Sequence, residues 1–442
     1  MKKIILILVF VLLAVVILRL PFNNRGNTQE SVKILTETRE KTDDDLGPGM
    51  MEKWEPICTV YLDAYHPIML YMVKHKSGAF SPDMKYFAMT NKTMNYDLVT
   101  NLFDLRTGEN LLHQLGKTAT PSIVPVAFSP DSKLLAFAKE NEFVIWNIEE
   151  KKIVTTVERY MEKNTCSLQF SNDRKYLYYV AESFTNTGAS HEIGYIWDVE
   201  TGKLIDVIEG NVDDRTNFSC YPDFSRAMVS QKWEKRYFIR DLETGVDLER
   251  MPNFNENSHT SKEFSNDMRY FANQSGREVR LSVWDAETGS DICTIPIVPD
   301  HLRAYTFLPD NKTFVTVVDP NPKNSQGYRR YDYIPKADPL PIPPIEGETH
   351  AIIEFWDLDD LIWDKHQANI FPKRTRICYL EGETTLCGLV ASPDGKLLYA
   401  NTDKNVKREG NSNDIGYIFA IDPNEKIELP AELKASKESY KR

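Results

Sequence analysis

Seven aspartates recur along the chain and are the residues best suited by type to metal binding or acid–base chemistry. They are Asp83, Asp131, Asp173, Asp223, Asp267, Asp310 and Asp394. Carboxylates that a fold brings together can bind calcium or act as a general acid and base. Each of these aspartates, however, directly follows Pro or Asn, and a basic residue comes two or three positions later. Because proline presets φ and an aspartate oxygen accepts turn amides, this context predicts turn-forming residues.

The cysteines and histidines show no spacing typical of a catalytic or metal site. The six cysteines are Cys58, Cys166, Cys220, Cys293, Cys378 and Cys387, with no Cys-x-x-Cys among them. We expect Cys58, Cys293 and Cys378 to hold equivalent positions in similar apolar segments far apart in the chain, and therefore to be buried free thiols beyond bridging distance. The eight histidines form no His-x-x-x-His pair. With no nucleophile elbow or phosphate-binding loop either, we predict no catalytic residue, no metal and no cofactor.

One insertion carries residue types that are common at binding hot spots. Between Asp319 and Thr349 the chain is rich in proline and contains Tyr328, Arg329, Arg330, Tyr331 and Tyr333. A proline-rich loop is semi-rigid, and tyrosine and arginine are enriched at protein interfaces. Two interpretations stay open: a partner-binding loop, or an insertion that has no partner.

The repeated aspartates mark an internal repeat. The Asp-to-Asp steps are 48, 42, 50, 44, 43 and 84 residues, and each aspartate precedes an apolar run such as 134–138. A turn followed by a segment rich in aromatic and branched residues is typical of a β-hairpin. Shorter excursions at 184–191 and 406–414 both precede the sequence Ile-Gly-Tyr-Ile, and we expect them on the same face of the fold.

A second motif closes most repeats, with an aromatic residue, a turn residue and often Thr-Gly. Its best copies are Trp197-Asp198 and Trp284-Asp285, while Trp146-Asn147 and Trp356-Asp357 keep the strand without Thr-Gly. Glycine after threonine suits a tight hairpin that needs a positive φ. We expect the large rings to pack between sheets and the aspartates to accept turn amides.

Taken together, these two motifs resemble those of the WD40-repeat family of β-propellers, over roughly residues 54–430. The Gly-His dipeptide of that family is absent from every repeat. The resemblance implies an all-β fold, a seven-bladed β-propeller, and a role in binding proteins. The 84-residue step holds the Trp356-Asp357 copy of the closing motif and the proline-rich insertion, so it does not add an eighth blade.

The ring needs a closing strand, and two segments compete for that place. Residues 56–62 have the local pattern of the outer strands around Cys293 and Cys378, which favours an N-terminal strand paired with the last blade. The alternative is the segment 426–430.

Composition limits the partner class. The chain has 442 residues, 41% of them hydrophobic, and a net charge of −12. Nucleic-acid backbones require clustered lysine and arginine, so we predict no nucleic-acid partner. An acidic surface favours basic or neutral proteins.

The first 20 residues differ from the rest of the chain. Lys2 and Lys3 precede an apolar run from Ile4 to Leu18, which fits a retained membrane anchor or a cleaved secretory signal. The absence of an Ala-x-Ala-like site favours the anchor, and both interpretations place the propeller outside the cytoplasm. We expect a flexible tether over 21–53, with room for a short helix at 30–41, and a charged tail over 431–442.

These features predict a non-enzymatic, membrane-anchored scaffold that binds proteins in the extracytoplasmic space. The alternative is a propeller enzyme or small-ligand receptor with its site at the central channel. A third hypothesis is a structural component of a larger membrane complex.

Overall fold

Strands account for nearly all regular structure in the part of the chain that the computed structural model describes. The described residues are 39–40, 52–61, 78–92, 98–116, 125–159, 164–184, 190–209, 216–221, 225–231, 236–242, 244–250, 263–274, 281–297, 302–318, 351–364, 369–380, 386–402 and 415–434. Every described strand belongs to the compact unit 39–442. No helix within these ranges is long and apolar enough to span a membrane.

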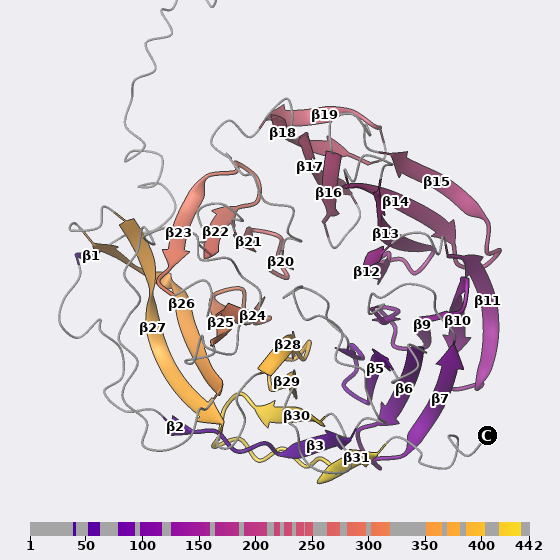
Figure 1. Cartoon of the computed structure of the whole chain (residues 1–442), viewed down its shortest axis with the longest axis horizontal. Coiled ribbons are helices and arrows are strands. Elements are labelled where there is room, and N and C mark those ends of the chain that lie inside the picture. The colour runs from indigo at the N-terminus through magenta and orange to yellow at the C-terminus, as the bar shows by residue number, and fades with distance from the viewer. Residues whose placement is uncertain are drawn as a thin grey trace, which may run out of the picture. The chain divides into compact units, whose positions relative to one another are not determined.

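Seven antiparallel sheets stand around a common axis, as the sequence motifs predict (Figure 1). Blade 1 comprises β4 (Gly78–Phe80), β5 (Tyr86–Lys92), β6 (Leu98–Asp104) and β7 (Asn110–Gly116). Blade 2 comprises β8 (Ala127–Phe128), β9 (Leu134–Lys139), β10 (Glu142–Asn147) and β11 (Lys152–Glu158). Blade 3 comprises β12 (Asn164–Phe170), β13 (Tyr176–Phe184), β14 (Ser190–Asp198) and β15 (Leu204–Glu209). Blade 4 comprises β16 (Thr216–Cys220), β17 (Arg226–Gln231), β18 (Arg236–Asp241) and β19 (Asp247–Arg250).

The remaining three blades include strands from both ends of the described chain. Blade 5 comprises β20 (Glu263–Phe264), β21 (Tyr270–Gln274), β22 (Leu281–Asp285) and β23 (Asp291–Ile295). Blade 6 comprises β24 (Leu302–Phe307), β25 (Thr313–Val318), β26 (Ala351–Asp364) and β27 (Asn369–Leu380). Blade 7 comprises β28 (Leu386–Ala391), β29 (Leu397–Thr402), β30 (Ile415–Ala420) and β3 (Cys58–Tyr61). Three short strands are added to these sheets: β1 (Arg39–Glu40), β2 (Glu52–Lys53) and β31 (Glu432–Lys434).

The repeated aspartates form the turns between the first and second strands of the blades. In five blades a serine hydroxyl donates a hydrogen bond to the aspartate two residues later, at 2.6–2.8 Å. The residue after the aspartate has a positive φ, as at Met84, Ser132 and Gly395. In blade 6, Asp310 instead accepts hydrogen bonds from Thr313. The turn role is therefore confirmed for six aspartates, while Asp223 lies outside the described residues.

The second motif forms the turns between the third and fourth strands, which we call the closing turns. Asp198 accepts hydrogen bonds from the amide and the hydroxyl of Thr201, both at 2.7 Å, and Asp285 binds Thr288 in the same way. Gly202 follows with a φ of +68°. Trp146, Trp197, Trp284 and Trp356 are all buried in clusters between blades, as predicted.

Blade 2 makes the same turn without Thr-Gly. Asn147 accepts the amide of Glu150 at 2.9 Å, and Lys151 takes the positive φ that glycine takes elsewhere. In blade 6 the turn is replaced by a long hairpin, because β26 and β27 stay paired from Asp357 out to Asp364 and Asn369.

Both kinds of turn lie at one end of the antiparallel strands, which we call the turn face. The connections between second and third strands leave from the opposite end, the loop face. The segments 185–189, 319–350 and 403–414 are such connections. The strand ends that flank the two shorter excursions therefore share a face, as expected, although the excursions themselves lie outside the described residues.

The glycine in each Ile-Gly-Tyr-Ile sequence makes room for a tyrosine of the neighbouring strand. A Cβ on Gly416 would lie 2.6 Å from the hydroxyl oxygen of Tyr399, and one on Gly194 would lie 2.8 Å from that of Tyr178. Both tyrosines are fully buried. The repeated sequence thus records a packing constraint inside blades 3 and 7.

The ring closes through the N-terminal strand, as predicted. β3 pairs antiparallel with β30, with Cys58 opposite Ile418. The competing segment 426–430 is not a strand, but β31 follows it and pairs parallel with the outer edge of β3. Parts of the predicted tether and tail therefore belong to the propeller. β2 pairs parallel with β27. β1 lies within 30–41, where the sequence allows a short helix, and pairs instead as a parallel strand with β26.

Candidate protein-interaction surface

The insertion that the sequence singled out lies outside the described residues. Its two flanking residues, Val318 and Ala351, end β25 and begin β26 at the loop face. Tyr328, Arg329, Arg330, Tyr331 and Tyr333 therefore remain a prediction.

The described cysteines are buried free thiols, and their burial opposes ionisation. Burial raises the pKa of Cys58 and of Cys378 to about 12, and it raises that of Cys293 well above its usual range. One detail of the prediction is wrong: Cys58 and Cys293 hold equivalent outer-strand positions, but Cys378 lies two residues further along its strand. The side chains of the other three cysteines lie outside the described residues.

The described part of the central channel shows no cluster of side chains that could bind a metal ion. Glu263 on β20 accepts a hydrogen bond from the Thr306 hydroxyl on β24 at 3.0 Å, which links two inner strands. Among the described residues, no three His, Cys, Asp or Glu side chains stand close enough to hold a metal ion. The channel hypothesis thus gains no geometric support from this part of the chain.

The outer strands carry a feature that the motifs did not reveal. In six blades the fourth strand has one extra residue next to the aromatic position of the third strand, which makes a β-bulge. The bulged residues are Leu111, Val154, Ile205, Leu248, Ile292 and Thr375. A bulge increases the local twist and turns a side chain away from its regular direction. Five of the six residues are apolar.

The exposure of the bulged residue differs around the ring, and Leu111 in blade 1 is half-buried while Thr375 in blade 6 is exposed. Val154, Ile205 and Leu248, in blades 2 to 4, have exposed fractions of 44, 55 and 48%, whereas Ile292 in blade 5 has 7%. The same position is therefore covered in one part of the ring and open to solvent in another.

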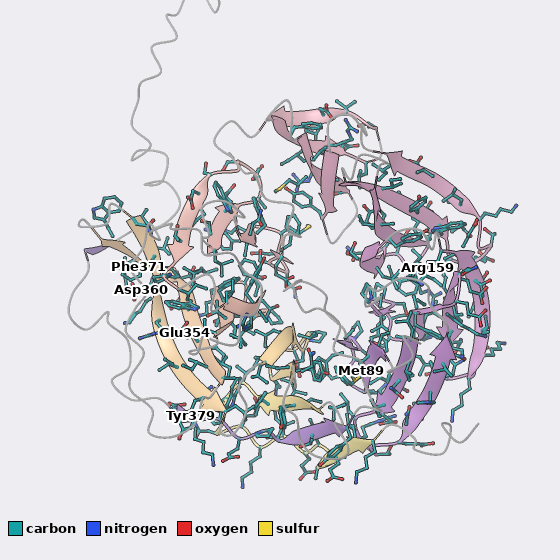
Figure 2. The ribbon with its side chains drawn as sticks, viewed as in Figure 1. Met89, Arg159, Glu354, Asp360, Phe371 and Tyr379 are labelled. Atoms are coloured by element: carbon teal, nitrogen blue, oxygen red, sulfur yellow. The ribbon has the colours of Figure 1, made fainter. Side chains whose placement is uncertain are left out.

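In blade 5 the cover comes from the long hairpin of blade 6. β27 packs beside β23, and Ile292 shares one hydrophobic cluster with Leu361, Ile362 and Phe371 of that hairpin. Figure 2 shows Asp360 and Phe371 on this extension. An addition to blade 6 thus fills the peripheral gap between blades 5 and 6.

The gap between blades 6 and 7 is filled by Trp54, which follows β2. Its ring stacks on Phe419 at 4.5 Å and meets Phe355 edge-on at 5.6 Å, and its Nε1 donates to the carbonyl of Ala420 at 3.1 Å. Arg376 lies over the Trp54 ring and also binds Glu52 at 2.9 Å. The N-terminal segment is therefore anchored by apolar and polar contacts.

The gap between blades 7 and 1 is filled by the C-terminal segment. Leu433 on β31 is fully buried in the cluster of Cys58, Val60 and Phe87, and Leu429 packs against the same cluster. We call these three filled junctions the filled rim.

Blades 1 to 4 have no such cover among the described residues. Seven of the eight exposed large apolar side chains in the described structure lie on, or directly before, their fourth strands. They are Leu115, Ile153, Val154, Leu204, Ile205, Val246 and Leu248. We call this set the open rim; in Figure 1 its strands β7, β11, β15 and β19 run along the outside of the ring. Clustered exposed apolar side chains mark interaction sites.

The charge beside the open rim is acidic. The closing turns and outer strands of blades 2 and 3 carry seven acidic residues and three basic ones: Glu149, Glu150, Glu158, Asp198, Glu200, Asp206 and Glu209 against Lys151, Lys152 and Lys203. Hydrogen bonds from Thr201 lower the pKa of Asp198, which keeps that carboxylate ionised. A basic protein segment would complement this charge.

Three buried charged side chains belong to the interior rather than to a surface site. Glu354 on β26 accepts from Arg374 of β27 at 2.7 Å and from the Thr316 hydroxyl at 3.4 Å (Figure 2). Burial raises the pKa of Glu354, although Arg374 opposes the shift. Burial likewise lowers the pKa of Arg159 to about 10. Glu354, Arg374 and Arg159 all lie inside the packed blades, away from solvent.

The sequence carried a weak signal for the open rim. Two apolar residues follow the closing turn in blades 2 and 3, as Ile153-Val154 and Leu204-Ile205, and Val246 and Leu248 flank Asp247 in blade 4. Periodicity alone predicts buried strands there, because it does not reveal which outer strands remain uncovered.

Comparison with known proteins supports the fold and nothing finer. No known protein family matches the sequence, and no curated protein is significantly similar to it. A chain in the crystal structure of a mitotic checkpoint complex is similar in structure, with a TM-score of 0.54 and 12% identity. The match covers 91% of this chain and 98% of that chain. At this identity the likeness shows a shared propeller fold, and function must be argued from sites.

Proposed function

We propose that the protein is a non-enzymatic scaffold that binds protein partners through the open rim. The observation that carries this proposal is the concentration of exposed apolar side chains on the outer strands of blades 1 to 4. A ring of packed sheets is rigid, so a partner that binds there loses little binding energy to ordering of the scaffold. The structural neighbour belongs to a protein complex, which is consistent with such a role.

We also propose that the protein is anchored in a membrane. Residues 1–20 anchor the protein, and the propeller works outside the cytoplasm. Support comes from the sequence alone, from the apolar run Ile4–Leu18 behind Lys2 and Lys3. Alkaline extraction of membranes tests the anchor: the full-length protein is expected in the membrane pellet, and its release into the soluble fraction would show that the first segment does not anchor it. A protease added to intact cells or spheroplasts tests the side, and we expect it to cleave the propeller.

The rim is tested by site-specific crosslinking. A photoreactive amino acid at Ile205 is expected to crosslink a protein partner in native membranes, while one at Tyr176 is the matched control. Tyr176 is also exposed and lies in the same blade, but it begins β13 rather than an outer strand. Equal crosslinking from both positions would contradict a rim-specific role.

The insertion is a second surface within the same function. Deleting residues 320–348 is expected to weaken partner recovery if Tyr328 and its neighbours contribute a binding loop. Unchanged recovery would remove the insertion from the proposal and leave the open rim in place.

A further inference from the structure

The chain's own added strands indicate how a partner binds the open rim. β31 and β2 each pair with the outermost strand of a blade, and both pairings are parallel. In each case a short strand is added to the edge of the sheet. An apolar side chain, Leu433 on β31 or Trp54 after β2, then fills the gap beside the next blade. The filled rim therefore contains two intramolecular examples of strand addition.

The open rim offers the same kind of edge without an occupant among the described residues. β15 is the last strand of its sheet, so one row of its backbone amides and carbonyls faces outward. Beside that edge, Leu204 and Ile205 are exposed. Strand addition supplies affinity through main-chain hydrogen bonds, and the side chains supply specificity.

The neighbouring blade leaves room at this place. A Cβ on Gly202, in the closing turn of blade 3, would lie 2.7 Å from Thr155 Oγ1 of blade 2, whereas a Cβ on Gly245, in the closing turn of blade 4, would meet nothing within 4 Å. The closing turn of blade 4 therefore leaves open the space that the turn of blade 3 fills against β11.

Charge selects the occupant. The polar positions of β31 are Glu432 and Lys434, which stay exposed on either side of buried Leu433. An occupant of β15 would place its polar positions beside Asp198, Glu200 and Asp206, which outnumber Lys203 there. Lysine or arginine at those positions is therefore favoured.

We infer that the outer edge of β15 binds an extended segment of a partner protein, alternating apolar with basic residues, as a parallel fifth strand of blade 3. This inference rests on the proposed function and specifies its binding mode. The apolar side chains of the segment pack on Ile205 and Leu204, and its lysines or arginines face the acidic closing turn.

The test uses a defined probe on the full-length protein in detergent. The probe is a labelled eight-residue peptide that alternates lysine and valine, and binding is followed by fluorescence anisotropy. A lysine–serine peptide of equal charge controls for electrostatics, and a lysine–valine peptide methylated at its four central amide nitrogens controls for main-chain pairing. We expect the lysine–valine peptide to bind at least tenfold more tightly than either control.

Variants and hydrogen exchange locate the site. Ile205→Ser is expected to weaken the lysine–valine peptide at least tenfold, and Tyr176→Ser less than twofold. Bound peptide should slow amide exchange in β15 but not in β3, whose outer edge β31 already occupies. Ile205 is exposed, so loss of folding is not expected, and the peptide controls do not depend on any variant.

The outcomes separate the inference from the proposed function. Equal binding of the methylated peptide, no binding of the lysine–valine peptide, or protection elsewhere than β15 would overturn strand addition. Crosslinking from Ile205 to a protein partner would still support the scaffold role in that case. Crosslinks only between copies of this chain would overturn the basic-segment partner in favour of self-association.

Discussion

The filled rim and the open rim are built from the same repeat, yet they end differently at the circumference. In both, the fourth strand of the blade bulges beside the aromatic position of the third. Around blades 5 to 7 the chain covers the gaps between neighbouring blades with a hairpin, a tryptophan and a C-terminal strand, whereas in blades 2 to 4 the bulged apolar side chains of the outer strands are exposed to solvent. The repeated blade therefore determines the ring, and the segments added to blades 5 to 7 determine which part of the rim stays exposed.

The covered part should be the part that holds the ring closed. Blade 7 takes one strand from the N-terminal segment and is sealed by a second from the C-terminal segment. Because closure removes the exposed sheet edges where the ends meet, residues that fill these junctions contribute to global stability. Because open-rim residues are exposed, we expect them to contribute little to global stability.

Replacing Trp54 with alanine should produce the largest loss. The substitution removes two ring contacts and the hydrogen bond to Ala420, and it leaves a cavity between blades 6 and 7. The expected decrease in the free energy of unfolding is about 3–5 kcal/mol. Urea unfolding followed by tryptophan fluorescence measures it, with circular dichroism as a second probe because the substitution removes a fluorophore. A decrease below about 1 kcal/mol would mean that Trp54 does not seal this junction.

Leu433→Ala tests the junction between blades 7 and 1. Leu433 is fully buried, and its truncation should cost about 2 kcal/mol, the lower end of the range for a buried leucine. Ile205→Ala is the matched control from the open rim and should change stability by about 0.5 kcal/mol or less. If both substitutions had the same effect, the division of the rim into covered and open arcs would have no energetic meaning.

The sequence predicted the parts of the fold that depend on local chemistry. Asp131 with Ser129, and Asp198 with Thr201, make turns through hydrogen bonds between residues two or three positions apart, so their pattern is visible in the chain. The closing strand β3 could be predicted, because the segment 56–62 that contains it shares its pattern with other outer strands.

The sequence did not reveal the rim, because its exposure depends on distant segments. Ile292 and Ile205 have the same local setting, and only the hairpin near Phe371 distinguishes them. Leu433 lies in a stretch that resembles a charged tail, and nothing near it in the chain indicates that it fills a gap beside Val60. Long-range contacts of this kind leave no period in the sequence.

Gly202 and Gly245 occupy equivalent closing turns, but only Gly202 lies in close contact with the neighbouring blade. Gly202 and Gly245 both have a positive φ, near +70°, so alanine at either place is strained by about 1 kcal/mol. At Gly202 the new Cβ would also clash with Thr155 and the carbonyl of Thr156, whereas at Gly245 it would meet nothing within 4 Å. Gly202→Ala should therefore destabilise more than Gly245→Ala, by about 1–3 kcal/mol.

Thermal unfolding of the two alanine variants, measured side by side, gives this difference directly. Lys151 shows that a side chain is accepted at the corresponding turn of blade 2, so neither substitution should prevent folding. Equal destabilisation would show that blade 4 contacts β15 as closely as blade 3 contacts β11. The space required for an added strand would then be absent.

Acid should have the smallest effect, through the closing turn of blade 1. Arg106 donates to both carboxylate oxygens of Asp104, at 2.9 and 2.5 Å, and these hydrogen bonds lower the pKa of Asp104. Because the pKa is lower in the folded state, the contribution is present above the usual aspartate pKa of about 3.9 and is lost as the pH falls through the lower, folded value. As Arg106 is exposed, the contribution should not exceed about 1 kcal/mol.

Asp104→Asn should remove this dependence while keeping the shape of the turn. Stability measured by urea unfolding should then fall less steeply between pH 5 and 3 in the variant than in the unaltered protein, with the two proteins differing most near neutral pH. Hydrogen exchange places the effect: after correction for the intrinsic pH dependence of exchange, acid should lower the protection factors in the closing turn of blade 1, and the variant should show low protection there at both pH values. An identical acid response in the two proteins would mean that the ion pair between Asp104 and Arg106 adds nothing to the stability of blade 1.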